Sequence, residues 1–244
     1  MSLRIACDLD GTIADMDSAL QREAERLFGP EVNLHAVPGE RLESAEDVEG
    51  HMSAESAVAA APPIASSIGR PLTPREIRRL WQHVAGVENF WMSLGEIEPG
   101  AVARLSALTA QHRWEIIFLT QRPSSAGETT QVQSQRWLRA HGFDLPSVMV
   151  MRGSRGKVAA ALSLDVVIDD RPENCLDVIA DSKAKPFLIW RLGAARMPPG
   201  LVGLAIESVP SMAGACVRLE RIMAERERGE SLFGRLRRAL GKSS

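Results

Sequence analysis

The chain of 244 residues has few cysteines, and no two of them lie close together. Cys7, Cys175 and Cys216 form no CxxC pair, the spacing typical of thiolate zinc sites and redox disulfides. Their odd number and wide separation also argue against a disulfide framework. We therefore expect the three thiols to be small buried side chains without chemistry of their own.

An excess of charge of either sign is also missing. Lysine and arginine number 29 against 31 aspartate and glutamate residues, a formal net charge of -2. Without a basic field over the whole surface, we expect neither nucleic acid nor a membrane as a partner. No apolar run approaches the length of a membrane span, and the first one is too short for a signal peptide, so we expect a cytoplasmic protein. The 5 histidines have no HxxxH or HExxH spacing that would indicate a metal site.

The end of the chain is the one exception to this balance of charge. Residues 232–244 contain no acid and four basic residues, Arg235, Arg237, Arg238 and Lys242. Their apolar neighbours could share one helical face, so a weak membrane-surface or partner-binding helix is one interpretation. Because the segment is short and interrupted by glycines, a frayed end after a mixed-charge helix over 211–228 is favoured.

Short apolar runs recur along the chain and alternate with segments of helical character. We expect strands at residues 3–7, 115–119, 147–151, 165–168 and 186–190. Helical patterns lie between them at residues 101–111, 129–141, 156–162 and 173–181. Short buried strands that alternate with helices predict an α/β fold with a parallel sheet covered on both faces.

The stretch between the first two expected strands has a different composition. Residues 16–95 are rich in alanine, glutamate and arginine and contain no convincing strand, which predicts an inserted helical cap. Within it, Thr73 to Glu76 combines a capping box with proline at the first helical position, and apolar residues follow with helical spacing. We therefore expect a core of residues 1–15 and 96–210, a cap of residues 16–95, and a C-terminal helix and tail at 211–244.

Polar residues follow the expected strands at the point where each ends. Asp8-Leu9-Asp10-Gly11-Thr12 comes directly after the first strand, Thr120 ends the second, and Asp169 and Asp170 end the fourth. Lys157 lies near the start of the helix before that fourth strand. Taken singly, these residues could be a turn, a strand end and a solvated helix residue. Together they gather acids, a hydroxyl and a cation at the edge where open α/β sheets bind ligands.

This set of motifs, in this order, resembles the haloacid dehalogenase superfamily from residue 3 to about residue 190. The resemblance implies a Rossmann-like parallel sheet with an α-helical cap inserted after the first motif. It also implies that Asp8 is a nucleophile that forms an aspartyl-phosphate and that Asp10 is the general acid and base. The second acid, Asp10, is typical of phosphatases and phosphomutases of the superfamily and is lacking in its dehalogenases.

A magnesium site is part of what the resemblance implies. Asp8, Asp169 and the backbone carbonyl of Asp10 would hold Mg²⁺, with Asp170 as a further ligand or next to one. The hydroxyl of Thr120 and the charge of Lys157 would hold and neutralise the phosphoryl group. The predicted activity is therefore magnesium-dependent hydrolysis of a phosphomonoester.

Three short segments narrow the resemblance to one branch of the superfamily. Residues 89–101, 118–123 and 169–175 are similar to the 5′(3′)-deoxyribonucleotidases. This similarity implies a 5′-nucleotidase acting on nucleoside monophosphates, with Thr12 and Gln121 at the substrate and the base stacked on Phe90 or Trp91. Packing between cap and core is the alternative for both rings. The alternative functions are a phosphatase of sugar phosphates or other small phosphometabolites, a phosphomutase, and an inactive phosphate-binding module.

Overall fold

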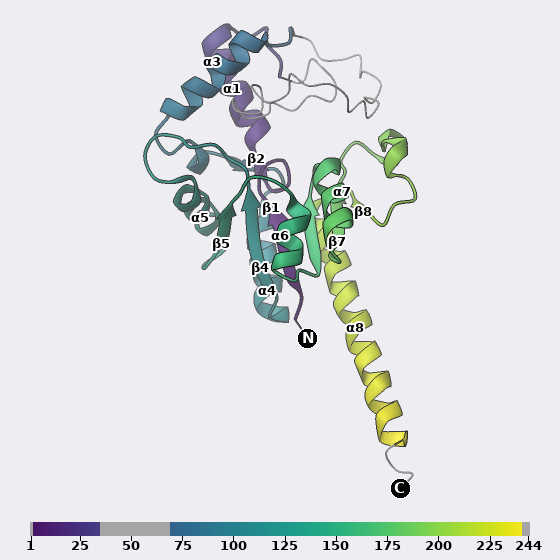
Figure 1. The fold of residues 1–244 in the computed structure, drawn as a ribbon. Helices are drawn as coiled ribbons and strands as arrows, with labels where there is room; N and C mark the ends of the chain where they lie inside the picture. The colour runs from purple at the N-terminus through teal and green to yellow at the C-terminus, as the bar shows by residue number, and fades with distance from the viewer. Residues whose placement is uncertain (1, 35–68, 241–244) are drawn as a thin grey trace.

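The computed structural model describes residues 2–34 and 69–240, and it contains a parallel sheet with helices on both faces (Figure 1). The sheet has six strands in the order β5-β4-β1-β6-β7-β8, and every neighbouring pair is parallel. The strands are β1 Arg4–Asp8, β4 Glu115–Thr120, β5 Ser147–Val150, β6 Val166–Asp169, β7 Lys185–Ile189 and β8 Glu207–Val209. This arrangement confirms the α/β fold with a parallel sheet.

Strand β8 is the one member of this sheet that the apolar pattern did not indicate. It has only three residues and lies at the edge, paired with β7 alone. The irregular segment before it contains two short 3-10 turns, Ala194–Arg196 and Pro199–Leu201. A strand this short carries no alternation long enough to be recognised.

Four helices alternate with the strands and lie within one residue of the predicted bounds: α4 Ala101–His112, α5 Thr130–Ala140, α6 Arg155–Ala161 and α7 Pro172–Asp181. The alternation of side chains along β1 divides the core between the two faces of the sheet. Ile5 and Cys7 pack with the faces of α4, α5 and α8, whereas Ala6 packs with α6 and α7. All three cysteines are free and buried, as predicted.

The described part of the expected cap lies beyond the carboxyl end of the sheet (Figure 1). It consists of α1 Met16–Phe28, α3 Pro74–Gly86 and the 3-10 turn η1 Phe90–Met92. Helix α3 begins with the predicted capping box, and its residues Leu80, Trp81 and Val84 are buried.

Two short strands lie where the chain leaves the core and returns to it. Strands β2 Ala14–Asp15 and β3 Gly95–Glu96 form an antiparallel pair close to the predicted cap boundaries. The middle of the expected cap, residues 35–68, lies outside the described residues, so the division into core and cap stays a prediction.

The C-terminal helix is longer than predicted. Helix α8 runs over Met212–Leu240 and extends away from the sheet (Figure 1), whereas the sequence indicated an end near residue 228. Gly229 and Gly234 each cost about 1 kcal/mol inside a helix, and the arginine, glutamate, leucine and alanine residues around them favour the helix enough to continue it. Among residues 2–34 and 69–240, no helix combines the length and apolar character needed to cross a bilayer.

Candidate active site

A tight turn after β1 brings the first pair of acids to the carboxyl edge of the sheet. Asp8 is the last residue of β1, and the amides of Ile13 and Ala14 both donate to the carbonyl of Leu9. Gly11 in this turn has φ of 80°, a conformation that glycine adopts without a steric penalty. The turn therefore requires glycine at this position and sets the direction in which Asp8 and Asp10 leave the strand.

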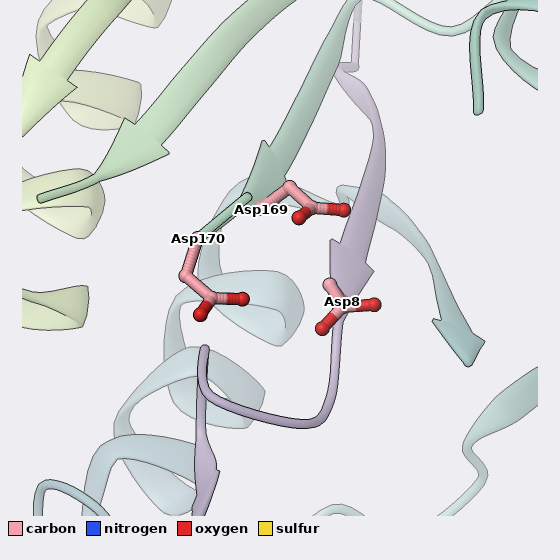
Figure 2. A group of neighbouring side chains, drawn as sticks. All are labelled: Asp8, Asp169 and Asp170. Atoms are coloured by element: carbon pink, nitrogen blue, oxygen red, sulfur yellow. The ribbon is translucent and has the colours of Figure 1, made fainter. Parts of the chain in front are cut away.

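Three carboxylates from β1 and the neighbouring β6 meet at this edge. Figure 2 shows Asp8 at the end of one strand, with Asp169 and Asp170 at the end of the other. Ligand oxygens of the three side chains all lie within 4.8 Å of one another. Asp8 and Asp169 are buried and Asp170 is half-buried. An all-oxygen set of this kind fits a hard divalent cation such as Mg²⁺.

The environment of Asp8 disfavours its negative charge unless a cation is close. Burial raises the pKa of Asp8, the neighbouring Asp169 raises it further, and Arg155 opposes the shift. The pKa lies well above the ordinary value of an aspartate. A carboxylate placed in this way gains most from a bound cation.

Asp169 and Asp170 are held by neighbouring residues of the chain. Nδ2 of Asn174 lies 3.0 and 2.9 Å from the two oxygens of Asp169, and the amide of Arg171 donates to Oδ1 at 2.9 Å. The buried hydroxyl of Thr12 donates to Oδ1 of Asp170 at 3.1 Å. Thr12, expected at the substrate, therefore supports the acid cluster in this structure.

The cation at the acid cluster is Arg155, the first residue of α6. Its Nη2 donates to Oδ1 of Asp8 at 2.5 Å, and its Nε lies 3.4 Å from Oδ2 of Asp169. The residue is only 2% exposed. Within the described chain, Nε and Nη1 have no hydrogen-bond partner. Arg155 thus offers buried donors beside the expected nucleophile, where a phosphoryl oxygen could accept them.

The sequence predicted Lys157 as this cation, whereas in the structure Arg155 contacts Asp8. Lys157 is exposed, and its ammonium group makes no hydrogen bond or ion pair with another described residue. Residues two apart on a helix point in nearly opposite directions, while residues four apart share a face. Arg155 therefore lies on the buried side with Ala159, and Lys157 does not. Gly156 shows which face of α6 packs against α7, because a Cβ at this position would lie 2.0 Å from the carbonyl oxygen of Asp177 in α7. The absence of a side chain at Gly156 therefore allows the two helices to approach in this orientation.

Asp10 is enclosed by residues that follow β4. The buried hydroxyl of Thr120 donates to Oδ2 of Asp10 at 3.1 Å, so in this structure it binds the expected acid. Arg122 forms an ion pair with the same carboxylate, with Nη2 2.7 Å from Oδ1. Gln121, expected at the substrate, is exposed. Side chains alternate along an extended chain, so Thr120 and Arg122 point inward and Gln121 points out.

The aromatic pair expected to stack on a base lies in the core. Phe90 and Trp91 are 2% and 0% exposed, and their rings pack edge to face at 5.0 Å. Nε1 of Trp91 donates to the carbonyl of Pro123 at 2.9 Å. A ring with no exposed surface offers no face to a ligand, so the packing alternative describes both side chains.

Most of the predicted site residues come together at one edge of the sheet, and others that the sequence did not indicate join them. Asp8, Asp10, Thr12, Thr120, Asp169 and Asp170 lie at the carboxyl ends of β1, β4 and β6 or directly after them. Lys157 and Gln121 are exposed, and Phe90 and Trp91 are buried in the core. The residues that sequence reasoning missed are Arg122, Arg155 and Asn174. The spacing of two of them could have indicated their side. Arg122 lies two residues from Thr120 along an extended segment, so both side chains point the same way. Arg155 lies four residues from Ala159 on a helix, so the two share a face.

Comparison with solved structures places the fold. A hydrolase of the haloacid dehalogenase family from Deinococcus radiodurans R1, solved with bound phosphate and sodium, superposes with a TM-score of 0.50 at 16% identity, covering 92% of this chain and 96% of that one. A hydrolase from Pseudomonas syringae gives 0.46 at 15% identity, covering 91% and 99% of the two chains. No protein-family model and no curated protein matches the sequence. The superposition on the Deinococcus radiodurans hydrolase shows that the chain has the fold of haloacid dehalogenase family hydrolases.

Proposed function

We propose that the chain is a phosphatase of the haloacid dehalogenase superfamily that hydrolyses small phosphomonoesters through an aspartyl-phosphate on Asp8. One observation carries this proposal: Asp8, Asp169 and Asp170 meet at the carboxyl end of two central parallel strands, with buried Arg155 on Asp8. The phosphate bound by the Deinococcus radiodurans hydrolase of the same fold adds support.

The chemistry follows from the positions of the two acids of the first motif. An oxygen of Asp8 attacks phosphorus, and the bond from phosphorus to the ester oxygen breaks while Asp10 gives that oxygen a proton. Asp10 then takes a proton from water as the water oxygen bonds to phosphorus. The bond from phosphorus to Asp8 breaks, which releases inorganic phosphate and restores the carboxylate.

Charge neutralisation is the main requirement, because a phosphomonoester repels an anionic nucleophile. Mg²⁺, when held by Asp8, Asp169 and Asp170, would supply positive charge between these carboxylates and the substrate. The two nitrogens of Arg155 that have no hydrogen-bond partner among the described residues would supply further positive charge and donors to the phosphoryl group. Asn174 and the amide of Arg171 keep Asp169 directed toward the cluster.

The substrate is proposed only as a small phosphomonoester, and two classes compete. Sugar phosphates and related metabolites are the first candidate, because they require recognition of the phosphate and no platform for a base. Nucleoside monophosphates are the second candidate, because residues 89–101, 118–123 and 169–175 are similar to the deoxyribonucleotidase branch. The burial of Phe90 and Trp91 removes the stacking platform that this candidate was expected to use.

A direct test measures phosphate release from 4-nitrophenyl phosphate with Mg²⁺ and with a chelator, in the wild type and in Asp8→Asn. Hydrolysis that requires the divalent ion and is lost in the variant supports the proposal. Activity that persists in chelator or in freshly purified Asp8→Asn contradicts it. A panel of nucleotides and sugar phosphates then ranks the two substrate classes by kcat/KM, and transfer of phosphate to a second sugar would identify a phosphomutase.

A further inference from the structure

Arg122 is a buried charge that the steps above do not use. Its side chain has no exposed surface, and its Cζ lies 5.1 Å from the ring centre of Trp91 and 6.0 Å from that of Trp137. Nη1 donates to the hydroxyl of Ser134 at 2.9 Å. Two indole faces and a hydroxyl therefore hold the guanidinium, and burying a charge at this depth is costly unless it has a partner.

The partner of Arg122 is the carboxylate of Asp10, and the contact has more than one point. Nε lies 2.9 and 2.8 Å from Oδ1 and Oδ2, and Nη2 lies 2.7 Å from Oδ1. Thr120 donates to Oδ2 as well, and its own oxygen accepts from the amide of Arg122 at 3.2 Å. A planar guanidinium that contacts both oxygens fixes the plane of the carboxylate as well as its position.

Of the ion-paired side chains of Asp10 and Arg122, only that of Asp10 is partly exposed. Its side chain is 13% exposed, whereas that of Arg122 is fully covered, so Arg122 reaches the site only through the acid. An acid that protonates a leaving oxygen must lie within hydrogen-bond distance and point at it. An error of about 1 Å in the position of such a group can cost about a hundredfold in rate.

From this arrangement we infer that Arg122 is a positioning residue that orients the carboxyl group of Asp10 toward the leaving-group oxygen. This inference rests on the proposed function, in which Asp10 protonates that oxygen. It assigns to Arg122 no contact with the substrate, and it assigns to Trp91, Trp137 and Ser134 the task of holding the guanidinium.

The test uses two probes whose leaving groups differ. The 4-nitrophenolate released from 4-nitrophenyl phosphate leaves without a proton, whereas the alkoxide released from 2-glycerophosphate needs one. Because Asp10 also acts as the base in the later hydrolysis step that both probes share, the comparison uses kcat/KM, which reports the steps up to release of the leaving group. Arg122→Met should lower kcat/KM for 2-glycerophosphate on the order of a hundredfold and for 4-nitrophenyl phosphate by less than about threefold, the pattern expected of a lost acid. Asp10→Asn should give the same pattern in kcat/KM, and adding Arg122→Met to it should change kcat/KM by less than about twofold.

Arg191 provides a matched control. It supports the same turn by donating to the carbonyls of Gly11 and Thr12 at 2.7 and 2.9 Å, without contacting Asp10. Arg191→Met should therefore affect both probes equally. If Arg122→Met does not fold, Arg122→Lys keeps the charge without the two-point contact and should show the same selective loss in weaker form.

Equal losses of kcat/KM on both probes, or losses of kcat/KM that multiply in the double variant, would overturn the role of Arg122 and leave the phosphatase intact. A wild type that hydrolyses neither probe would overturn the proposed function, and the positioning role would fall with it.

Discussion

Replacing Arg155 with methionine should destabilise the metal-free protein and remove most of its activity, whereas the same change at Lys157 should do neither. Arg155 is 2% exposed and is the cation that touches Asp8 and Asp169, so its loss leaves three neighbouring carboxylates without compensation. Removing one partner of a buried ion pair costs about 3–5 kcal/mol. For a chain of this size each kcal/mol corresponds to about 2–4 °C in Tm, so the expected fall is about 6–20 °C in chelator.

Magnesium should reverse part of this loss, because a divalent ion among the carboxylates supplies the missing positive charge. Lys157 is exposed, and a surface substitution of this kind changes stability by about 0.5 kcal/mol or less. Lys157→Met should therefore shift Tm by no more than about 2 °C. In the proposed reaction Arg155 donates to the phosphoryl group, so Arg155→Met should lower kcat about 10²- to 10³-fold.

The assay is thermal unfolding of both variants and the wild type, with chelator and with Mg²⁺, followed by turnover of 4-nitrophenyl phosphate. Arg155→Lys separates charge from geometry, because it keeps the charge and loses the planar fork. Equal effects of the two methionine variants, or a larger effect at Lys157, would refute the assignment of Arg155 as the cation of the site.

Four further outcomes follow. In Asp8→Asn the guanidinium of Arg155 keeps Asp169 as a partner, so removing the disfavoured charge of Asp8 should raise Tm in chelator by about 2–4 °C, the shift for about 1 kcal/mol in a chain of this size. Because the pKa of Asp8 is raised on folding, the wild type loses stability as pH rises through that pKa, so the gain should vanish at low pH. Mg²⁺ at a hundred times its Kd should stabilise the wild type by about 2.7 kcal/mol and leave Asp169→Asn unchanged. Trp91→Ala should cost about 3–5 kcal/mol and lower turnover of nucleotides and sugar phosphates equally, whereas a loss confined to nucleotides would revive the stacking hypothesis. Deleting residues 232–244 should leave kcat and Tm unchanged, and a large fall in either would show that this end docks on the core.

The elements that carry the site could be predicted because their signals are local. Buried parallel strands give continuous apolar runs, and the carboxyl end of each run showed where Asp8, Thr120 and Asp169 would meet. The capping box at Thr73 likewise depends on neighbours within one helical turn. Predictions of this kind needed no knowledge of how distant segments pack.

The residues that sequence reasoning missed depend on contacts between distant segments. Whether Arg155 or Lys157 faces the acids is decided by the close approach of α6 and α7 at Gly156, a contact between two separate helices. Similarly, Trp91 contacts residues about thirty positions later in the chain: its ring lies under the guanidinium of Arg122, and its Nε1 donates to the carbonyl of Pro123. The sequence indicates that an aromatic ring is hydrophobic, but packing between distant segments determines which residues the ring contacts.

Whether Asp8 carries the phosphoryl group during turnover can be tested by trapping the intermediate. The protein is mixed with 4-nitrophenyl phosphate and Mg²⁺, quenched in acid within the first turnover, and digested for mass spectrometry of the peptide that contains Asp8. We expect a phosphate adduct on Asp8 that decays as the quench is delayed after substrate is exhausted and is absent from Asp8→Asn. Rapid turnover with no adduct on Asp8, or with an adduct on another residue, would contradict it.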